Sequence, residues 1–206
     1  MSKEIIKELN VEKLNICEPD GQVKMTLFNS QNIPSLIIEG EDILPGHRTN
    51  DGISGAMFYN NEGDECGGFI YGSQLDENGN VSMGMSLTFD QYKQDQVFQL
   101  LLQQEGENKQ YGISMFDRPN KHIKESMDLI KRIKTEKDKD VQSKLHKKYL
   151  KENAKRLFIG KDFDGLMKLA LYNKEGEESI KLFIDEDDNP KILIKGKEIN
   201  LEDILK

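Results

Sequence analysis

The residues most suggestive of chemistry lie in the run 64–68, Asp-Glu-Cys-Gly-Gly, which places a thiol directly before two glycines. A cysteine nucleophile in such a position can use the following backbone N–H groups as an oxyanion hole. Sites of that kind usually read Gly-x-Cys-Gly-Gly, whereas Asp64 stands here at the first glycine and His47 is the only histidine before Cys66. Glu65 beside the thiol would raise its pKa, which is the wrong direction for a nucleophile. We therefore expect the tight start of a strand, with glycines that allow close backbone approach.

Two acidic turns begin like the first half of a calcium-binding loop. Residues 76–80 read Asp-Glu-Asn-Gly-Asn and residues 185–189 read Asp-Glu-Asp-Asp-Asn. An EF-hand loop also needs Gly at its sixth position and Glu at its twelfth. The residues at those positions are Val81 and Leu87 in the first copy, and Pro190 and Gly196 in the second. Both copies fail both tests, so we expect plain hairpin turns, and weak calcium binding of another kind stays an open alternative.

No other pattern of catalytic or binding residues emerges. His122 and His146 are too far apart in the sequence for a zinc motif, and His47 stands alone. The chain has no GxGxxG, Walker, GxSxG or HExxH motif. The sequence thus predicts no catalytic, cofactor-binding or metal-binding residues and no cofactor, and it leans against an enzyme.

Composition limits the class of protein. The chain has 206 residues with 36% hydrophobic and 32% charged residues, which is typical of a globular chain with a modest core. Its two cysteines are too few for a disulfide framework, and no apolar run approaches the length of a membrane span. We therefore expect a soluble, acidic, cytoplasmic protein that does not contact membranes. The net charge of −8 also argues against a general nucleic-acid binder.

Residues 1–120 alternate between strand patterns and turn signals. The clearest strand is 81–89, where Val, Met, Met, Leu and Phe alternate with Ser, Gly, Ser and Thr. This period of two predicts one apolar face and one face of small side chains. The small face is either simply exposed or covered by a helix, a second sheet or another subunit. Residues 96–104 suit a strand or a helix, and we expect a strand because 105–108 is typical of a hairpin loop.

From 121 to 156 the apolar residues, such as Ile123, Met127 and Ile130, follow a helical period. This segment holds 13 Lys or Arg and 6 Asp or Glu, so a basic element is carried on an acidic body. Because the segment contains no Gly or Pro, we expect one long amphipathic helix. A helical hairpin is the alternative, since 134–140 contains no apolar residue. The opposite charges favour docking of the helix on the β body, in the same chain or in a neighbouring subunit.

These patterns predict a mostly β fold, α+β by content, in a single domain over 1–206. Hairpins in 1–120, the helix in 121–156 and further hairpins in 157–206 would complete one body. A lone hairpin is unstable, so the hairpins must stack into a sheet, a sandwich or a barrel-like body. A shared motif, Tyr-Asn-x-Glu-Gly-Asp/Glu-Glu, occurs at 59–65 and 172–178 and marks repeated units on both sides of the helix.

The segments 58–68, 86–96 and 117–119, which include FYNNEGDECGG, SLTFDQYKQDQ and DRP, resemble a group of bacterial proteins. The similarity continues through 158–162 to the C-terminal hairpins and thus covers most of the chain. The resemblance implies a bacterial origin and a shared β-repeat fold. It implies no activity and supplies no catalytic residues.

We therefore expect a non-enzymatic interaction or scaffold protein that self-associates through its sheet or its helix, or binds a protein partner. The alternative is a ligand-binding module or enzyme with a pocket around Gly63–Gly72 and Gln91–Gln104, lined by Asp64, Glu65 and Gln94. A small-molecule ligand cannot be named from the sequence. Nucleic-acid contact through the basic helix is a weaker alternative, because the lysines have almost no aromatic neighbours on which bases could stack.

Overall fold

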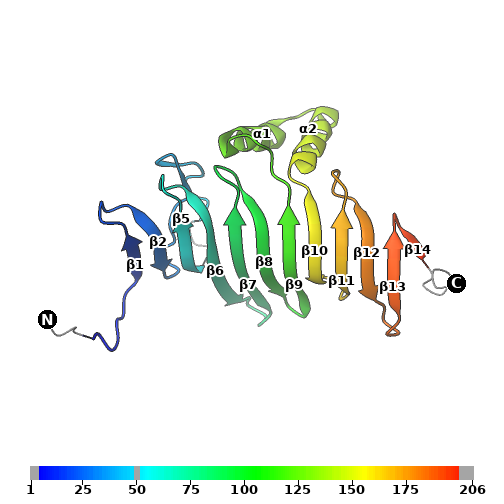
Figure 1. The fold of residues 1–206 in the computed structure, drawn as a ribbon, viewed down its shortest axis with the longest axis horizontal. Helices are drawn as coiled ribbons and strands as arrows, with labels where there is room; N and C mark the ends of the chain where they lie inside the picture. Colours follow the sequence, from blue (N-terminus) through cyan, green and yellow to red (C-terminus); the bar gives the residue numbers. More distant parts are fainter. Residues whose placement is uncertain (1–4, 49–51, 200–206) are drawn as a thin grey trace.

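The computed structural model describes residues 5–48 and 52–199. Its main feature is one antiparallel sheet of twelve strands, in which the strands lie nearly in chain order (Figure 1). In order across the sheet these strands are β1 (Lys13–Cys17), β2 (Val23–Phe28), β5 (Ser54–Tyr59), β6 (Glu65–Leu75), β7 (Val81–Asp90), β8 (Gln96–Glu105), β9 (Asn108–Phe116), β10 (Lys155–Lys161), β11 (Met167–Tyr172), β12 (Glu178–Ile184), β13 (Pro190–Ile194) and β14 (Lys197–Ile199).

The mostly β prediction, with hairpins before and after the helical segment, is confirmed. Of the three bodies that the sequence allowed, the hairpins within residues 5–48 and 52–199 form an open sheet and no closed barrel, with β1 and β14 at its two edges. The uncertain segment 96–104 belongs to strand β8, as expected. It pairs with β7 on one side and with β9 on the other, so neighbouring strands decide a local preference that the sequence left open.

Five hairpin turns share one hydrogen-bonding scheme. In each, an Asn or Asp side-chain oxygen at the first turn position accepts hydrogen bonds from the backbone N–H groups two and four residues later. These capping residues are Asn60, Asp76, Asp162, Asn173 and Asp185. Four of the five turns place Gly at the fourth position with φ near +80°, a conformation that other residues adopt only with strain. The Asn and the Gly of the repeated Tyr-Asn-x-Glu-Gly motif are therefore explained by the geometry of the turn.

One face of the sheet is apolar from edge to edge. The strand register places one apolar side chain from every strand in a single row across the sheet. The row is Leu14, Leu27, Ala56, Phe69, Leu87, Leu100, Ile113, Ile159, Leu169, Leu182, Ile192 and Ile199. Side chains directly opposite each other on paired strands share a face, so this row and every second residue from it along each strand define the apolar face.

The opposite face, here the polar face, carries small and polar residues at its centre and holds most of the buried core. Its small side chains from β7 include Ser86 and Thr88, as the 81–89 alternation predicts. Phe28, Met57 and Phe158 on this face are buried. Part of the cover comes from residues 29–48, here the arm, which contain two short paired strands, β3 (Ile37–Ile38) and β4 (Glu41–Asp42).

The helical segment forms two helices, α1 (Ile123–Thr135) and α2 (Lys139–Glu152), beyond the same end of the strands (Figure 1). The single long helix over about 121–156 is therefore corrected, and the two-helix alternative holds. The break needs neither Gly nor Pro. The side chain of Asp138 accepts hydrogen bonds from the backbone N–H groups of Asp140 and Val141 and so caps the start of α2. In a continuous helix these N–H groups would instead donate to backbone carbonyls of the preceding turn.

Candidate functional site

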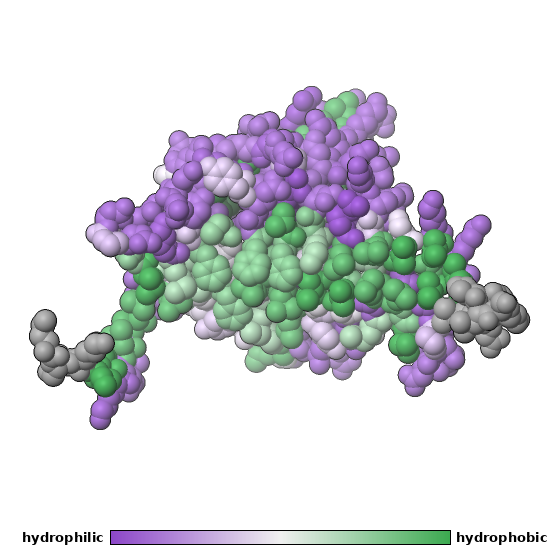
Figure 2. All heavy atoms as spheres, in the orientation of Figure 1, coloured by the Kyte–Doolittle hydropathy of each residue, from purple (hydrophilic) through white to green (hydrophobic). Residues whose placement is uncertain are grey.

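The apolar face is the largest candidate site. Sixteen of its large apolar side chains are at least 36% exposed, among them Leu100 at the centre of the sheet at 46% and Phe89 at 48%. Figure 2 shows them as a continuous green band across the strands. Phe89 and Phe98 stack within this band at 5.4 Å between ring centroids. In the part of the chain that the structure describes, no layer of secondary structure covers the band.

The size of this surface is unusual for an isolated chain. Large side chains exposed to this degree leave on the order of 1,000 Å² of apolar area on one face. The largest apolar patch of a typical monomer measures roughly 300–600 Å², and larger patches mark interaction surfaces. The face therefore has the extent of an interface.

Charge on the apolar face is sparse and of one sign. Away from the hairpin bulges, the register of the described strands places no Asp or Glu there. The charged members are Lys109, Lys161 and Lys197, which lie near strand ends. Charged residues are depleted from the centres of protein interfaces because burying an unpaired charge is unfavourable. The centre of this face meets that condition.

The polar face holds a different kind of site, a half-open cavity of about 460 Å³ above β6, β7 and β8. Its lining includes Gly84, which has no side chain, and Ser86, whose side chain is small, so both leave the space free. Gln99 and Gln103 contribute amides, and Gln99 donates a hydrogen bond to the Ser86 hydroxyl at 3.2 Å. The cavity has the volume of a small-molecule site.

An ion pair limits one end of this cavity. Both terminal nitrogens of Arg48 donate to the carboxylate of Glu65 at 2.7 Å, and one also donates to the Pro34 carbonyl at 2.9 Å. The two charges neutralise each other. The Glu105 carboxylate also lines the cavity and accepts a hydrogen bond from the Ser82 hydroxyl at 3.1 Å. The other hydrogen-bonding side chains of the lining are amides and hydroxyls, which suit an uncharged polar ligand.

The Cys66 thiol is unsuited to nucleophilic catalysis. Burial raises the pKa of Cys66, and the nearby carboxylates of Asp90 and Glu65 raise it further. Among the described residues, no histidine side chain forms a hydrogen bond with this thiol. Glu65 therefore raises the pKa of Cys66, as the sequence predicts, and burial makes the larger contribution to the increase.

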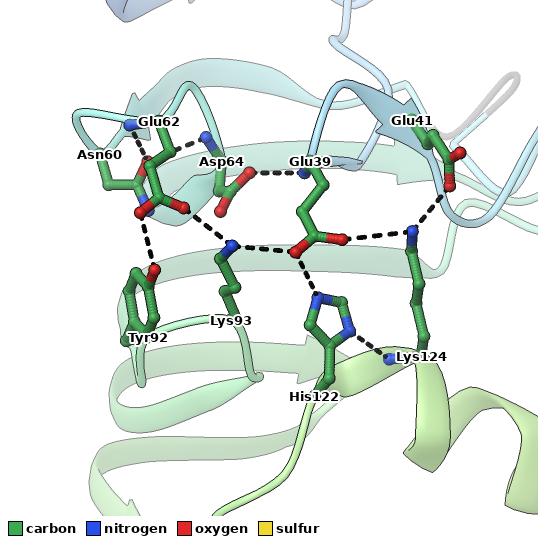
Figure 3. Close-up of polar contacts among 9 residues, drawn as sticks. All are labelled: Glu39, Glu41, Asn60, Glu62, Asp64, Tyr92, Lys93, His122 and Lys124. Atoms are coloured by element: carbon green, nitrogen blue, oxygen red, sulfur yellow. Dashed lines mark hydrogen bonds and ion pairs between the residues drawn. The ribbon is translucent and has the colours of Figure 1, made fainter.

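A network of polar contacts holds the arm to the sheet and to helix α1 (Figure 3). The backbone N–H of Glu39 donates to the Asp64 carboxylate at 2.6 Å. Lys93 in the β7–β8 turn pairs with both Glu39 and Glu62 at 2.9 Å, and these contacts lower the pKa of both carboxyl groups. Lys124 of α1 contacts Glu39 at 3.6 Å. The network is a structural clamp that joins four segments distant in sequence.

The residues predicted to line the alternative pocket do not come together. Glu65 lines the cavity, but Asp64 is fully buried under the arm, with one carboxylate oxygen unpartnered. Gln94 is 2% exposed and donates to the Lys121 carbonyl and the Ser126 hydroxyl. The cavity nevertheless borders both expected segments, through residues 65–72 and 96–103.

The structure also places the acidic turns and the histidines that the sequence offered as candidates. The Asp76 and Asp185 carboxylates accept hydrogen bonds within their own turns, which lowers the pKa of each. No cluster of three or more metal-ligating side chains occurs among residues 5–48 and 52–199. His122 is the N-cap of α1 and accepts from the Lys124 N–H, while His47 and His146 are exposed.

Two further features were harder to anticipate. Arg118 of the Asp-Arg-Pro segment donates to the Gln96 carbonyl at 2.7 Å and to Asn153 at 3.0 Å, so it ties β8 to the end of α2. The unbroken apolar face was missed because it depends on the register between strands. Its sequence signal is the apolar alternation within each strand, which predicts an apolar face but not that the face stays uncovered.

Basic residues of the helical segment do contact acidic residues of the body. Lys124 pairs with Glu41 at 2.7 Å, and Lys151 pairs with Glu175 at 3.2 Å. Lys121 instead pairs with Glu152 inside the segment. The helices thus dock within the same chain by pairing some of their basic residues with acidic residues of the β body. In the described residues, neither helix is long and apolar enough to cross a membrane.

Comparison with known protein families, with curated proteins and with solved structures found no match. The geometry of the two faces therefore carries the functional argument by itself.

Proposed function

We propose that this chain is a non-enzymatic interaction protein that acts by burying its apolar face against another protein chain. The observation that carries the proposal is the apolar row through all twelve strands, with large side chains exposed on the order of 40%. Burial of apolar surface contributes roughly 25 cal/mol per Å², so covering this face offers a large favourable free energy. A cytoplasmic location belongs to the same proposal, supported by two unpaired cysteines.

The proposal predicts that the face is covered in the cell. Hydroxyl-radical footprinting of the full chain in fresh lysate should label Met85 and Met115 much more slowly than Tyr92, which lies off the face and is 64% exposed. The variant Leu100→Lys, which places a charge at the centre of the face, should restore fast labelling. The matched control Gln103→Lys changes the opposite face of the same strand and should not. Fast labelling of the unmodified chain in lysate would refute the proposal.

A second candidate function is binding of a small neutral polar ligand in the cavity above β7 and β8. The observation in its favour is the combination of a volume of about 460 Å³ with amide and hydroxyl groups and a neutralised ion pair. Gly84 offers a clean test, because a Cβ there would meet nothing within 4 Å. N-acetylglucosamine and glycinamide are suitable neutral probes. Chemical-shift changes on adding them should be confined to the cavity and disappear in Gly84→Val.

A further inference from the structure

We infer that the chain covering the apolar face is a second copy of this protein, so that two twelve-stranded sheets stack face to face. The inference rests on the proposed function, because it names the occupant of the same surface. The exposed apolar area, on the order of 1,000 Å² per chain, exceeds the roughly 800 Å² per partner of a standard stable interface. The area is therefore enough for a stable dimer without any contribution from the helices or the arm.

A second copy matches the dimensions of the face. An apolar row that crosses twelve strands needs a partner surface that is equally wide and equally flat, or much of the row stays in water. Two sheets pack about 10 Å apart with strand directions within about 30° of each other, and their inner side chains interdigitate. An identical sheet supplies that surface over its whole width.

The charges also favour a self-complementary pairing. A two-fold symmetric interface brings a patch against itself, so any charge near the axis meets its own kind. The centre of this face carries no charge, because Leu100 and Ile113 lie in the middle of the row. The lysines of the face lie near strand ends, and the acidic residues lie mainly in turns and on the other face. Two copies can therefore meet at the centre without buried like charges.

The position of the symmetry axis follows from the order of the strands. Six strands lie on each side of the boundary between β8 and β9, so a two-fold axis near that boundary covers both faces completely. Phe98, Leu100, Ile113 and Met115 then form the centre of the interface. An axis nearer one edge would leave part of each row exposed.

A lipid surface is the main competing occupant. Anionic lipid is disfavoured by the net charge of −8, which would repel the chain from such a surface. A neutral lipid surface is tested directly below with vesicles of phosphatidylcholine.

The test measures mass and coverage on the purified full chain. Light scattering after size exclusion should give twice the chain mass at 5 μM, and footprinting of the same sample should show Met85 and Met115 protected. Leu100→Lys should dimerise at least 100-fold more weakly and elute as a folded monomer with an unchanged β circular dichroism spectrum. Gln103→Lys should remain dimeric. If Leu100→Lys does not fold, the milder Leu100→Ser should weaken dimerisation in the same direction.

Each contrary result has a separate meaning. The purified chain could be monomeric with Met85 and Met115 labelled quickly, while both residues are protected in lysate. That result would overturn the inference of a second copy but not the proposed function, because a different protein would then cover the face. Fast labelling of Met85 and Met115 in the purified sample and in lysate would overturn the proposed function as well as the inference of a second copy. A monomer that sediments with phosphatidylcholine vesicles and is protected on them also overturns both. A dimer that survives Leu100→Lys with the face still open places the contact elsewhere and overturns the inference.

Discussion

At the scale of single residues, Asp90 couples this fold to pH. One of its carboxylate oxygens is buried with no hydrogen-bond partner. Burial, with added repulsion from Glu65 and Asp95, raises the pKa of Asp90 to about 7, although Arg118 and Arg48 oppose the shift. The unfolded chain has a pKa nearer 4 for such a group. Between these two values the folded protein binds more protons than the unfolded chain, so stability from this group falls as pH rises.

The first prediction concerns Asp90→Asn, which removes the buried charge and nearly keeps the shape. At pH 8 the variant should gain on the order of 2 kcal/mol in free energy of unfolding, after allowance for partial exposure. Near pH 4 the gain should almost vanish, because Asp90 is then protonated in the folded state. Urea unfolding at both pH values measures this. Asp164→Asn, in an exposed turn, is the control, and an equal gain for Asp90→Asn at both pH values would contradict the assignment.

At the scale of elements, the ion pair between Arg48 and Glu65 joins the end of the arm to strand β6. The side chains of Arg48 and Glu65 are 17% and 9% exposed, so this ion pair is largely screened from water. Removing one partner of such a pair leaves an unpaired buried charge, which costs about 3 kcal/mol or more.

The second prediction follows from that pair. Arg48→Met should lower the free energy of unfolding by roughly 3 kcal/mol and make the arm more sensitive to limited proteolysis. The double variant Arg48→Met with Glu65→Gln should recover part of the loss, because no carboxylate is then left unpaired. A double-mutant cycle from urea unfolding gives the coupling energy. Coupling within error of zero would mean that the pair does not hold the arm.

The third prediction concerns the break between the helices. Asp138→Ala removes the side chain that accepts from the Asp140 and Val141 N–H groups. It should lower the local stability of α2 by about 1 kcal/mol, the usual effect of losing an N-cap. Amide hydrogen exchange should quicken by roughly fivefold in α2 and stay unchanged in β8. Asp128→Ala on the exposed surface of α1 is the control, since its pairing with Lys131 is weak at 3.8 Å.

These elements also show how far the sequence could lead. The alternation in 81–89 predicted β7 and both of its faces, because a strand's period depends on the chain alone. The break at Asp138 was predicted only as the alternative of a helical hairpin, because an N-cap inside a polar run has no stronger signal than any other aspartate. The clamp of the arm was missed entirely. Asp64, Glu39 and Lys93 meet only after three turns have formed, and no spacing in the sequence encodes that.

At the scale of the whole molecule, a single-layer sheet of this width should gain stability from association. If folding and pairing are coupled, the thermal midpoint depends on protein concentration.

The fourth prediction is that the midpoint rises by about 4 °C between 1 and 100 μM chain, as mass action on a dimer of this size requires. Leu100→Lys should show a midpoint independent of concentration. Differential scanning calorimetry over that range measures both. A constant midpoint in the unmodified chain would mean that the sheet is stable without a partner.

The near-sequential order of the strands has a consequence for how this sheet forms and varies. Each strand hydrogen-bonds to its neighbours in the chain, except where the arm separates β2 from β5 and the helices separate β9 from β10. Most strand pairs therefore join neighbours in the chain, and the sheet can grow strand by strand from an early hairpin. By the same reasoning, whole hairpins could be added or lost at either edge without disturbing interior pairs. The width of the apolar face, and with it the strength of pairing, can thus change in steps of two strands.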